Sequence, residues 1–277
     1  MTLGLSALSG STFLLLYIAL LAAALGLSLM LGAWMRAEGD DAGTPSEEEL
    51  AFLSGGKQRF TEAIIARLLA GGSIEVSGEK GFVVTRSDAG TTSAERAITR
   101  QAGIVTWQDA AKATAQDADS VLERLETKGW WMGDGAAWQV RLFQVLPFAL
   151  LFALGLFRQQ AGAAQGAPTG YLIGLLALTA LIGLFRLFAV DRRTKAGKAV
   201  LGGAMQGNDR LRRAPQEHEM GSAVALFGTG VLVGTPFVAM HTMRQASSGD
   251  GGGSSDSSSS SDGGSGCGGG GCGGCGG

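Results

Sequence analysis

The chain has 277 residues, of which 45% are hydrophobic, and a formal net charge of −2 at pH 7. Its apolar residues are concentrated in a few runs with few or no charges, which is typical of an integral membrane protein. The only three cysteines stand close to the C-terminus, which excludes a secreted fold held together by disulfides.

The first apolar run covers residues 12–34 and contains no charge. At about 1.5 Å per residue it is long enough to cross a hydrocarbon layer of roughly 30 Å. A cleaved signal peptide is the alternative, but residues 1–11 carry no positive charge and the run exceeds the usual apolar core of about 7–15 residues. We therefore predict an N-terminal transmembrane anchor over residues 1–35.

A soluble domain is predicted over residues 36–141, with a first helix marked by Glu47, Glu48 and Glu49. Within it, IIARLLAGGSIEV at 64–76 resembles VLERLETKGWWMG at 121–133. Each copy predicts an amphipathic helix that stops at a glycine and is followed by a β-hairpin. Helix–hairpin units of this kind are typical of winged-helix domains, so we expect a small α+β, winged-helix-like domain built from two repeats.

The net charge of this predicted domain indicates which class of partner it can bind. Residues 36–141 hold 12 basic and 17 acidic side chains, a net charge of −5. Nucleic-acid binding needs a basic face that displaces counterions from phosphates. We therefore expect a protein partner, and nucleic-acid binding is the less favoured alternative.

Two further apolar runs, at 142–157 and 171–190, predict a membrane hairpin over residues 142–190. The first run is short, so it needs local thinning of the bilayer or snorkelling by Arg141 and Arg158. The next segment, 191–220, is basic, and the positive-inside rule places it in the cytoplasm. The domain over 36–141 is then cytoplasmic, the N-terminus lies outside, and the bilayer is the cell (cytoplasmic) membrane.

The last apolar run, within residues 221–243, has no charge over 221–240 and is long enough for a fourth span. The spacing Gly230-x-x-x-Gly234 would suit close helix packing, whereas Pro236 and the threonines favour an interfacial or re-entrant helix. The sequence leaves both alternatives open. The side of the membrane on which the C-terminus lies depends on which is correct.

The Gly/Ser/Cys-rich tail over residues 244–277 predicts a disordered segment. Its thiols, Cys267, Cys272 and Cys275, are one ligand short of a tetrahedral zinc site, which a second chain or His241 would have to complete. Three interpretations remain: a low-complexity end without a ligand, covalent modification or cross-linking, and binding of a soft metal. Thioredoxin-like chemistry is not expected, because the glycines around Cys272 and Cys275 cannot form the helix that lowers a thiol pKa.

Motifs of catalysis are missing from the sequence. It contains no phosphate-binding loop, no zinc-protease motif and no nucleophile elbow, and its only histidines are His218 and His241. We therefore expect no catalytic residue and no cofactor other than a soft metal at the tail.

The sequence resembles an uncharacterised bacterial family of small multi-pass membrane proteins with a Gly/Ser/Cys-rich C-terminal tail. The resemblance rests on the N-terminal span, on the segments EEELAFLSGG, GLFRLFAVDRRTKAGKAVL and AVALFGTGVLVG, and on the tail. It covers nearly the whole chain. It implies the architecture and a bacterial cytoplasmic membrane, and it assigns no activity and no functional residue.

The expected fold is therefore a mainly α membrane protein, with three to four transmembrane helices, a small α+β winged-helix-like cytoplasmic domain and a disordered tail. The function that fits this architecture best is a membrane-anchored scaffold or accessory protein, with the lipid bilayer and a protein as its partners. A metal- or redox-sensing membrane protein that uses the cysteine tail is the alternative. A membrane-tethered nucleic-acid-binding regulator is the third hypothesis.

Overall fold

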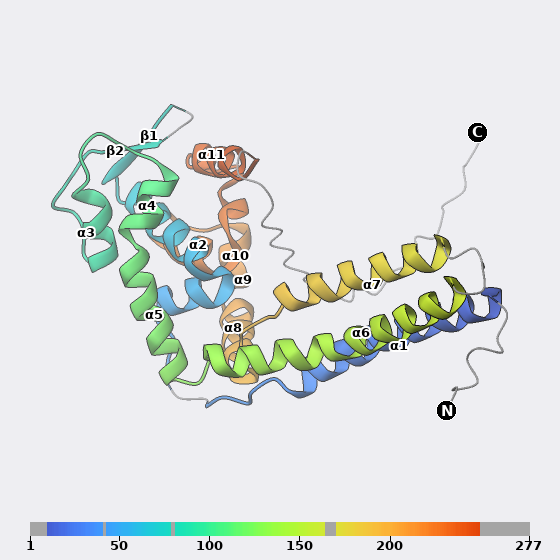
Figure 1. The fold of residues 1–277 in the computed structure, drawn as a ribbon. Coiled ribbons are helices and arrows are strands. Elements are labelled where there is room, and N and C mark those ends of the chain that lie inside the picture. Colours follow the sequence, from blue (N-terminus) through green and yellow to red (C-terminus); the bar gives the residue numbers. More distant parts are fainter. Residues whose placement is uncertain (1–9, 41–42, 79–80, 164–169, 250–277) are drawn as a thin grey trace, which may run out of the picture.

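The structure is a computed structural model that describes residues 10–40, 43–78, 81–163 and 170–249. It is mainly helical and has two parts: an elongated three-helix bundle and a compact domain at one end of it (Figure 1). The bundle consists of α1 (Gly10–Trp34), α6 (Asp134–Ala163) and α7 (Gly170–Phe188). The domain contains α2 (Glu47–Ala70), β1 (Ile74–Ser77), β2 (Gly81–Val84), α3 (Ser93–Thr99), β3 (Ile104–Val105), α4 (Trp107–Ala113), α5 (Ala115–Thr127), α8 (Lys195–Gly207), α9 (Asp209–Arg213), η2 (Glu217–Glu219), α10 (Met220–Phe227), η3 (Thr229–Leu232) and α11 (Val238–Gly249).

The bundle accounts for the three longest apolar runs. Within the described ranges, three helices are long and apolar enough to cross a membrane: Thr12–Trp34, Asp134–Gln160 and Gly170–Phe188. Many large apolar side chains on the outer surfaces of these helices are exposed, and Phe157 is 80% exposed. In water such a surface would be an aggregation hazard, whereas a bilayer would cover it. This confirms that the predicted runs are helices of membrane-spanning length.

The interior of the bundle is closely packed and contains a polar contact. Phe148, Leu172 and Leu176 are buried between the helices. The Tyr17 hydroxyl is also buried and lies 3.1 Å from the Thr179 hydroxyl, which donates to a backbone carbonyl of its own helix. The pair gives both hydroxyls a partner, as a low-dielectric interior requires.

The compact domain is built around α2. The helix begins at a capping box, in which the Ser46 side chain accepts from the Glu49 backbone and the Glu49 carboxylate accepts from the Ser46 backbone. It bends at Gly56, whose φ of +65° favours glycine. Its apolar face packs against helices on both sides of the α6–α7 hairpin in sequence, notably α5 before it and α10 after it (Figure 1). One core therefore unites both halves of the chain.

The first predicted helix–hairpin unit is confirmed. After α2 stops at Gly71, β1 and β2 pair antiparallel, with Ile74 opposite Val84. The third strand, β3, joins the other edge of β2 and places Val105 opposite Phe82. Among the described residues these strands form one sheet in the order β1-β2-β3.

The second predicted hairpin is wrong. Helix α5 does end where expected, but Trp131 makes an isolated bridge to Arg193, and Met132 donates its backbone N–H to Arg192. The residues expected to form the returning strand belong to α6, which starts at Asp134. A carboxylate at a helix N-terminus and two following alanines favour this earlier start. The bundle helix is therefore longer than the predicted run of 142–157, and the domain boundary at 141 moves to about residue 133.

The apolar run within 221–243, a possible fourth transmembrane or interfacial helix, does not form one continuous helix. Helix α10 has eight residues and ends at Gly228, whose φ of +85° interrupts the helix. A 3₁₀ turn and α11 follow, so the apolar run is divided. The side chains of α10 are buried against α2, and Val224 and Ala225 have no exposed surface. Beyond α10 the run is only partly buried, through Leu232 and Met240, so its first half is apolar because it completes the core of the domain.

Candidate functional site

The three predicted thiol ligands, Cys267, Cys272 and Cys275, lie outside the described residues. Within the described residues, no group of three or more His, Cys, Asp or Glu side chains is arranged to hold a metal ion. The polar contacts of the described residues include three ion-pair clusters, and the surface of this part of the chain includes two hollows.

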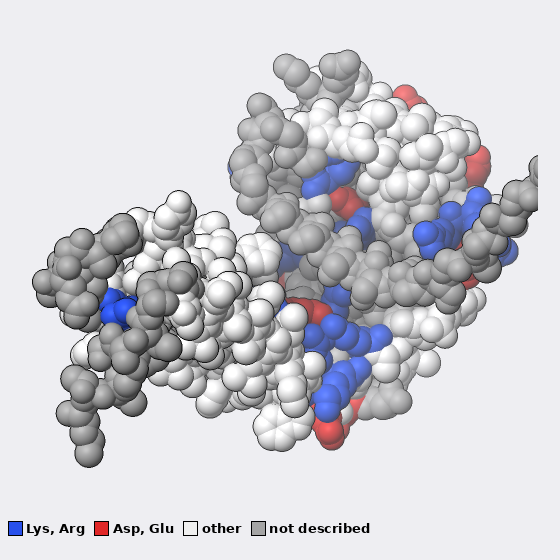
Figure 2. Space-filling model, turned by 90° about the vertical axis from the view of Figure 1, so that its right-hand side faces the viewer, with Lys and Arg blue, Asp and Glu red and all other residues white. Residues whose placement is uncertain are grey.

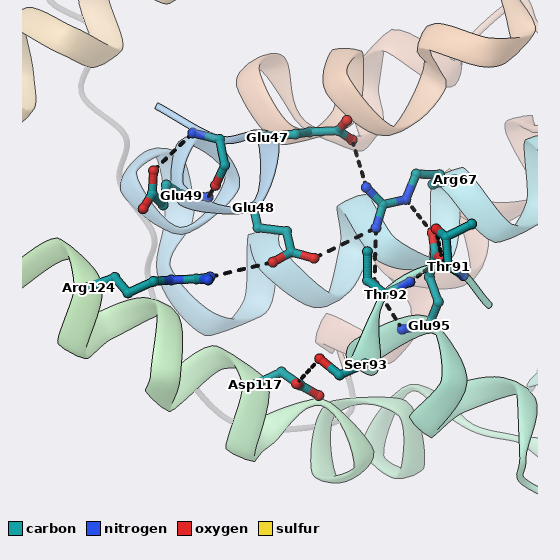
Figure 3. Close-up of polar contacts among 11 residues, drawn as sticks. Glu47, Glu48, Glu49, Arg67, Thr91, Thr92, Ser93, Glu95, Asp117 and Arg124 are labelled. Atoms are coloured by element: carbon teal, nitrogen blue, oxygen red, sulfur yellow. Dashed lines mark hydrogen bonds and ion pairs between the residues drawn. The ribbon is translucent and has the colours of Figure 1, made fainter. Parts of the chain in front are cut away.

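The first cluster surrounds Arg67, on α2, and is shown in Figure 3. We call it the Arg67 cluster; it consists of Glu47, Glu48, Arg67, Thr92 and Glu95. The guanidinium donates through Nε to the Glu95 carboxylate and lies 3.7 Å and 3.8 Å from the carboxylates of Glu47 and Glu48. It therefore ties the first turn of α2 to the start of α3.

Glu95 is the most buried member of the Arg67 cluster. Burial alone would raise the pKa of its carboxyl. Hydrogen bonds from the Thr91 side chain and the Thr92 backbone, together with the charge of Arg67, outweigh that effect and hold the pKa below its ordinary value. An ionised carboxylate with this many donors is a structural acceptor and is poorly suited to transfer protons near neutral pH.

Glu49, in the first turn of α2, has a comparable environment. Lys128 donates from Nζ to both carboxylate oxygens at 2.8 Å. Burial alone would raise the pKa of Glu49, but the Lys128 and Ser46 hydrogen bonds hold it below its ordinary value. The pair joins α2 to the end of α5.

The second cluster joins the C-terminal helix to α2. The buried Glu62 carboxylate accepts from Arg59 at 2.9 Å and from Arg244 at 2.7 Å. Arg244 also lies over the ring of Trp107, 5.9 Å from its centroid. Because Glu62 and Arg244 are far apart in sequence, these contacts fix α11 on the domain.

The third cluster, which we call the bundle–domain junction, lies where the bundle meets the domain and consists of Arg36, Asp191, Arg193 and Lys198. Asp191 follows α7 and receives Arg36 at 3.2 Å and Lys198 at 2.8 Å. Its carboxyl also accepts from the Arg193 backbone, while the Arg193 guanidinium donates to the Ser54 carbonyl on α2 at 2.6 Å. Burial would raise the pKa of Asp191, but the Lys198 and Arg193 hydrogen bonds keep it below its ordinary value.

The distribution of charge around the junction is uneven. Figure 2 shows basic side chains gathered on the domain beside the bundle, whereas the visible flank of the bundle is almost free of charge. The domain therefore presents positive charge next to the apolar surface of the bundle.

The two hollows differ in character. One is an open depression of about 470 Å³ between β2, β3 and the end of α3, with Val83 and Ile104 exposed on it. The other, of about 150 Å³, lies among the domain-side ends of the three bundle helices and is lined by Arg36, Gln144 and Arg186 among others. Each has a buried polar atom without a hydrogen-bond partner in its lining, Thr99 Oγ1 in the first and Gln144 Oε1 in the second, and the second also contains two arginines.

The ion-pair clusters escaped the sequence analysis because their members are far apart in the chain. One sign was present: Asp191 stands as a single acid at the head of a basic segment, directly after an apolar run.

Comparison of the chain with protein-family models, with curated proteins and with solved structures finds no match in any of the three.

Proposed function

We propose that the protein is a membrane-anchored scaffold or accessory factor, whose compact domain and cysteine tail lie on the same, cytoplasmic side of the membrane. One observation carries the proposal: α10 and α11 pack into the core of the domain beside α2. The C-terminal part of the chain therefore does not recross the bilayer.

The side of the tail follows in two steps. Helix α11 ends at Gly249 on the domain, and residues 250–277 contain no apolar run that could enter a bilayer. The tail and the domain therefore share a side. The basic junction and the basic segment after α7 favour the cytoplasm for that side.

A cytoplasmic tail limits the chemistry of its thiols. Glutathione and thioredoxin keep most cytoplasmic thiols reduced, so lasting disulfides are disfavoured. Modification, capture of a partner, and binding of a soft metal all use the reduced form. Cys267, Cys272 and Cys275 are then groups that the membrane anchor holds near a fixed surface, which raises their effective concentration toward a partner there.

The alternative of a metal-sensing protein gains from the same placement, because thiolate ligands require reduced cysteines. Titration of the purified full chain with zinc or copper(I) separates the two functions. A sensor binds metal tightly through the tail and loses the binding when all three cysteines are changed to serine, whereas a scaffold shows no dependence on metal. The winged-helix-like fold and nucleic-acid binding gain no support, since the second helix–hairpin unit is not formed.

Thiol labelling tests the proposed arrangement, because every native cysteine lies in the tail. Bacterial cells that produce the full chain, with any outer membrane removed, are treated with a membrane-impermeant maleimide before and after lysis. We expect no labelling of the wild-type chain before lysis and labelling of reduced thiols after it. If mass spectrometry shows the thiols already modified, the serine-background variants below report the same topology.

Two control variants fix the sides in a background where the three cysteines are serine. Ser87→Cys places an exposed thiol on the domain and should behave as the wild-type tail does. Gln160→Cys, exposed at the far end of α6, should label before lysis. Labelling of the tail before lysis, with Ser87→Cys protected, would contradict the proposal.

A further inference from the structure

The smaller hollow has the position and size of a site for a lipid head group. It lies where the domain-side ends of α1, α6 and α7 meet and has a volume of about 150 Å³. At roughly 30 Å³ per water molecule, it has the volume of about five waters. This is enough for a phosphate with its ester oxygens, while the acyl chains of a lipid would remain on the apolar surface outside.

Gln144 supplies the first sign that the hollow takes a ligand. It lines the cavity, is only 7% exposed, and its Oε1 has no hydrogen-bond partner. A Cβ at Gly32, which faces it, would lie 2.1 Å from the Gln144 amide nitrogen, so a larger residue at position 32 would push the amide out of its present place. Unpaired buried polar groups are costly, and a bound ligand is one explanation for them.

The charges that line the hollow supply the second sign. Arg186 is on α7 inside an apolar helix, and among the described residues no carboxylate lies within ion-pair distance of it. Arg36 is paired with Asp191, which also lines the hollow, but the Asp191 carboxylate is shared with Lys198 and with the Arg193 backbone. The hollow therefore has an excess of positive charge at membrane depth, where a cation requires a counter-ion.

We propose that this cavity binds the head group of an anionic phospholipid that carries a head-group hydroxyl, of the phosphatidylglycerol type. The phosphate oxygens accept from the guanidinium groups of Arg36 and Arg186, and the head-group hydroxyl donates to Gln144 Oε1. Leu29, at the rim and 55% exposed, provides apolar surface for an acyl chain. Basic pockets between transmembrane helices on the cytoplasmic side are known to hold anionic head groups.

The lipid would act as a third component of the junction between bundle and domain. Its phosphate would touch a residue from the end of α1 and one from the end of α7, and its hydroxyl would touch α6. A bound lipid would thereby hold the three helices together beside the salt bridges of Asp191. This inference rests on the proposed function, because it requires the bundle to span a bilayer.

The test uses the full chain in nanodiscs of phosphatidylcholine, with native mass spectrometry after addition of phosphatidylglycerol, or of sodium phosphate as the soluble source of the same anion. We expect one phosphatidylglycerol to be retained in preference to phosphatidylcholine, and little effect of sodium phosphate. Arg186→Gln removes a charge-assisted contact and should weaken retention about 10- to 100-fold. Arg212→Gln, an exposed arginine on α9, should retain the lipid as the wild type does.

A second variant guards against misfolding of the first. Gly32→Ala keeps every charge but places a methyl group where the Gln144 amide lies, so it should weaken retention while far-UV circular dichroism stays unchanged. Equal retention by wild type and Arg186→Gln, or no preference for phosphatidylglycerol, would overturn the inference. Displacement of the lipid by sodium phosphate would assign the site to a soluble phosphate instead. Failure of the chain to enter nanodiscs would overturn the proposed function as well.

Discussion

Removal of the contact between Glu62 and Arg244 tests most sharply whether α11 packs on α2. The Glu62 carboxylate is 4% exposed and the Arg244 side chain 19% exposed. Arg244→Met keeps most of the apolar stem of the side chain and removes the guanidinium. If α11 lies on α2 as described, the domain loses one buried charge-assisted contact.

The size of the loss follows from the groups involved. A hydrogen bond to a charged group contributes about 1.5–3 kcal/mol, and the position over Trp107 adds about 0.5–1 kcal/mol. Arg59 remains within 2.9 Å of Glu62 and limits the penalty for an unpaired carboxylate. We expect a loss of about 2–4 kcal/mol, which for a domain of this size lowers the melting temperature by roughly 4–16 °C.

The assay is thermal unfolding of the full chain in detergent, followed by tryptophan fluorescence. A double-mutant cycle with Glu62→Gln isolates the pair, and we expect a coupling energy of about 1–3 kcal/mol. Arg213→Met is the matched control: its side chain is 80% exposed and pairs with Asp209 on the same helix, so it should cost less than about 0.5 kcal/mol. A coupling energy indistinguishable from zero would show that α11 does not rest on α2, and the reasoning would fail.

Three further predictions test other parts of the molecule. In the folded protein the pKa of Glu49 is below its ordinary value of 4.5. The ionised carboxylate therefore stabilises the fold fully above about pH 4.5, and this stabilisation should be lost as the pH falls through the folded pKa. In urea unfolding, the free energy of unfolding of Glu49→Gln should depend less on pH than that of the wild type. Gly155→Ala would place a Cβ 2.7 Å from Leu176 and should destabilise the bundle by about 1–3 kcal/mol, whereas Gly174→Ala meets nothing within 4 Å and should be tolerated in the same detergent melts. Thr179→Val removes the partner of the Tyr17 hydroxyl and should cost about 0.6–1.7 kcal/mol, with no change if that hydrogen bond is absent.

The bundle helices were predictable because length and hydropathy alone define them. The first helix–hairpin unit was predictable as well, since helix periodicity, a glycine stop and alternating strands are local signals. The second unit failed although its sequence resembles the first. Trp131 pairs with Arg193, which follows the α6–α7 hairpin in sequence, and no local pattern reveals that partner.

Residues 221–240 show why an apolar run is ambiguous. Burial in a protein core and insertion in lipid both select uncharged side chains, and Val224 and Ala225 satisfy either environment. The glycines gave the better guide, because Gly228 and Gly234 adopt positive φ and interrupt the run. Gln144 can also be seen in the sequence as a polar residue in an apolar helix. Its place in a candidate site depends on Arg186 and Gly32, which line the same hollow only in the folded chain.

The central claim is that residues 220–249 belong to the compact domain and not to the membrane, and one pair of cysteine variants tests it most directly. Val233→Cys and Leu181→Cys, each in a background without native cysteines, replace side chains that are 61% and 64% exposed in the structure. In inside-out membrane vesicles we expect a water-soluble maleimide to label residue 233 and to leave residue 181, within α7, unlabelled because lipid covers it. Protection of residue 233 to the same degree as residue 181 would place the segment in the bilayer and contradict the account.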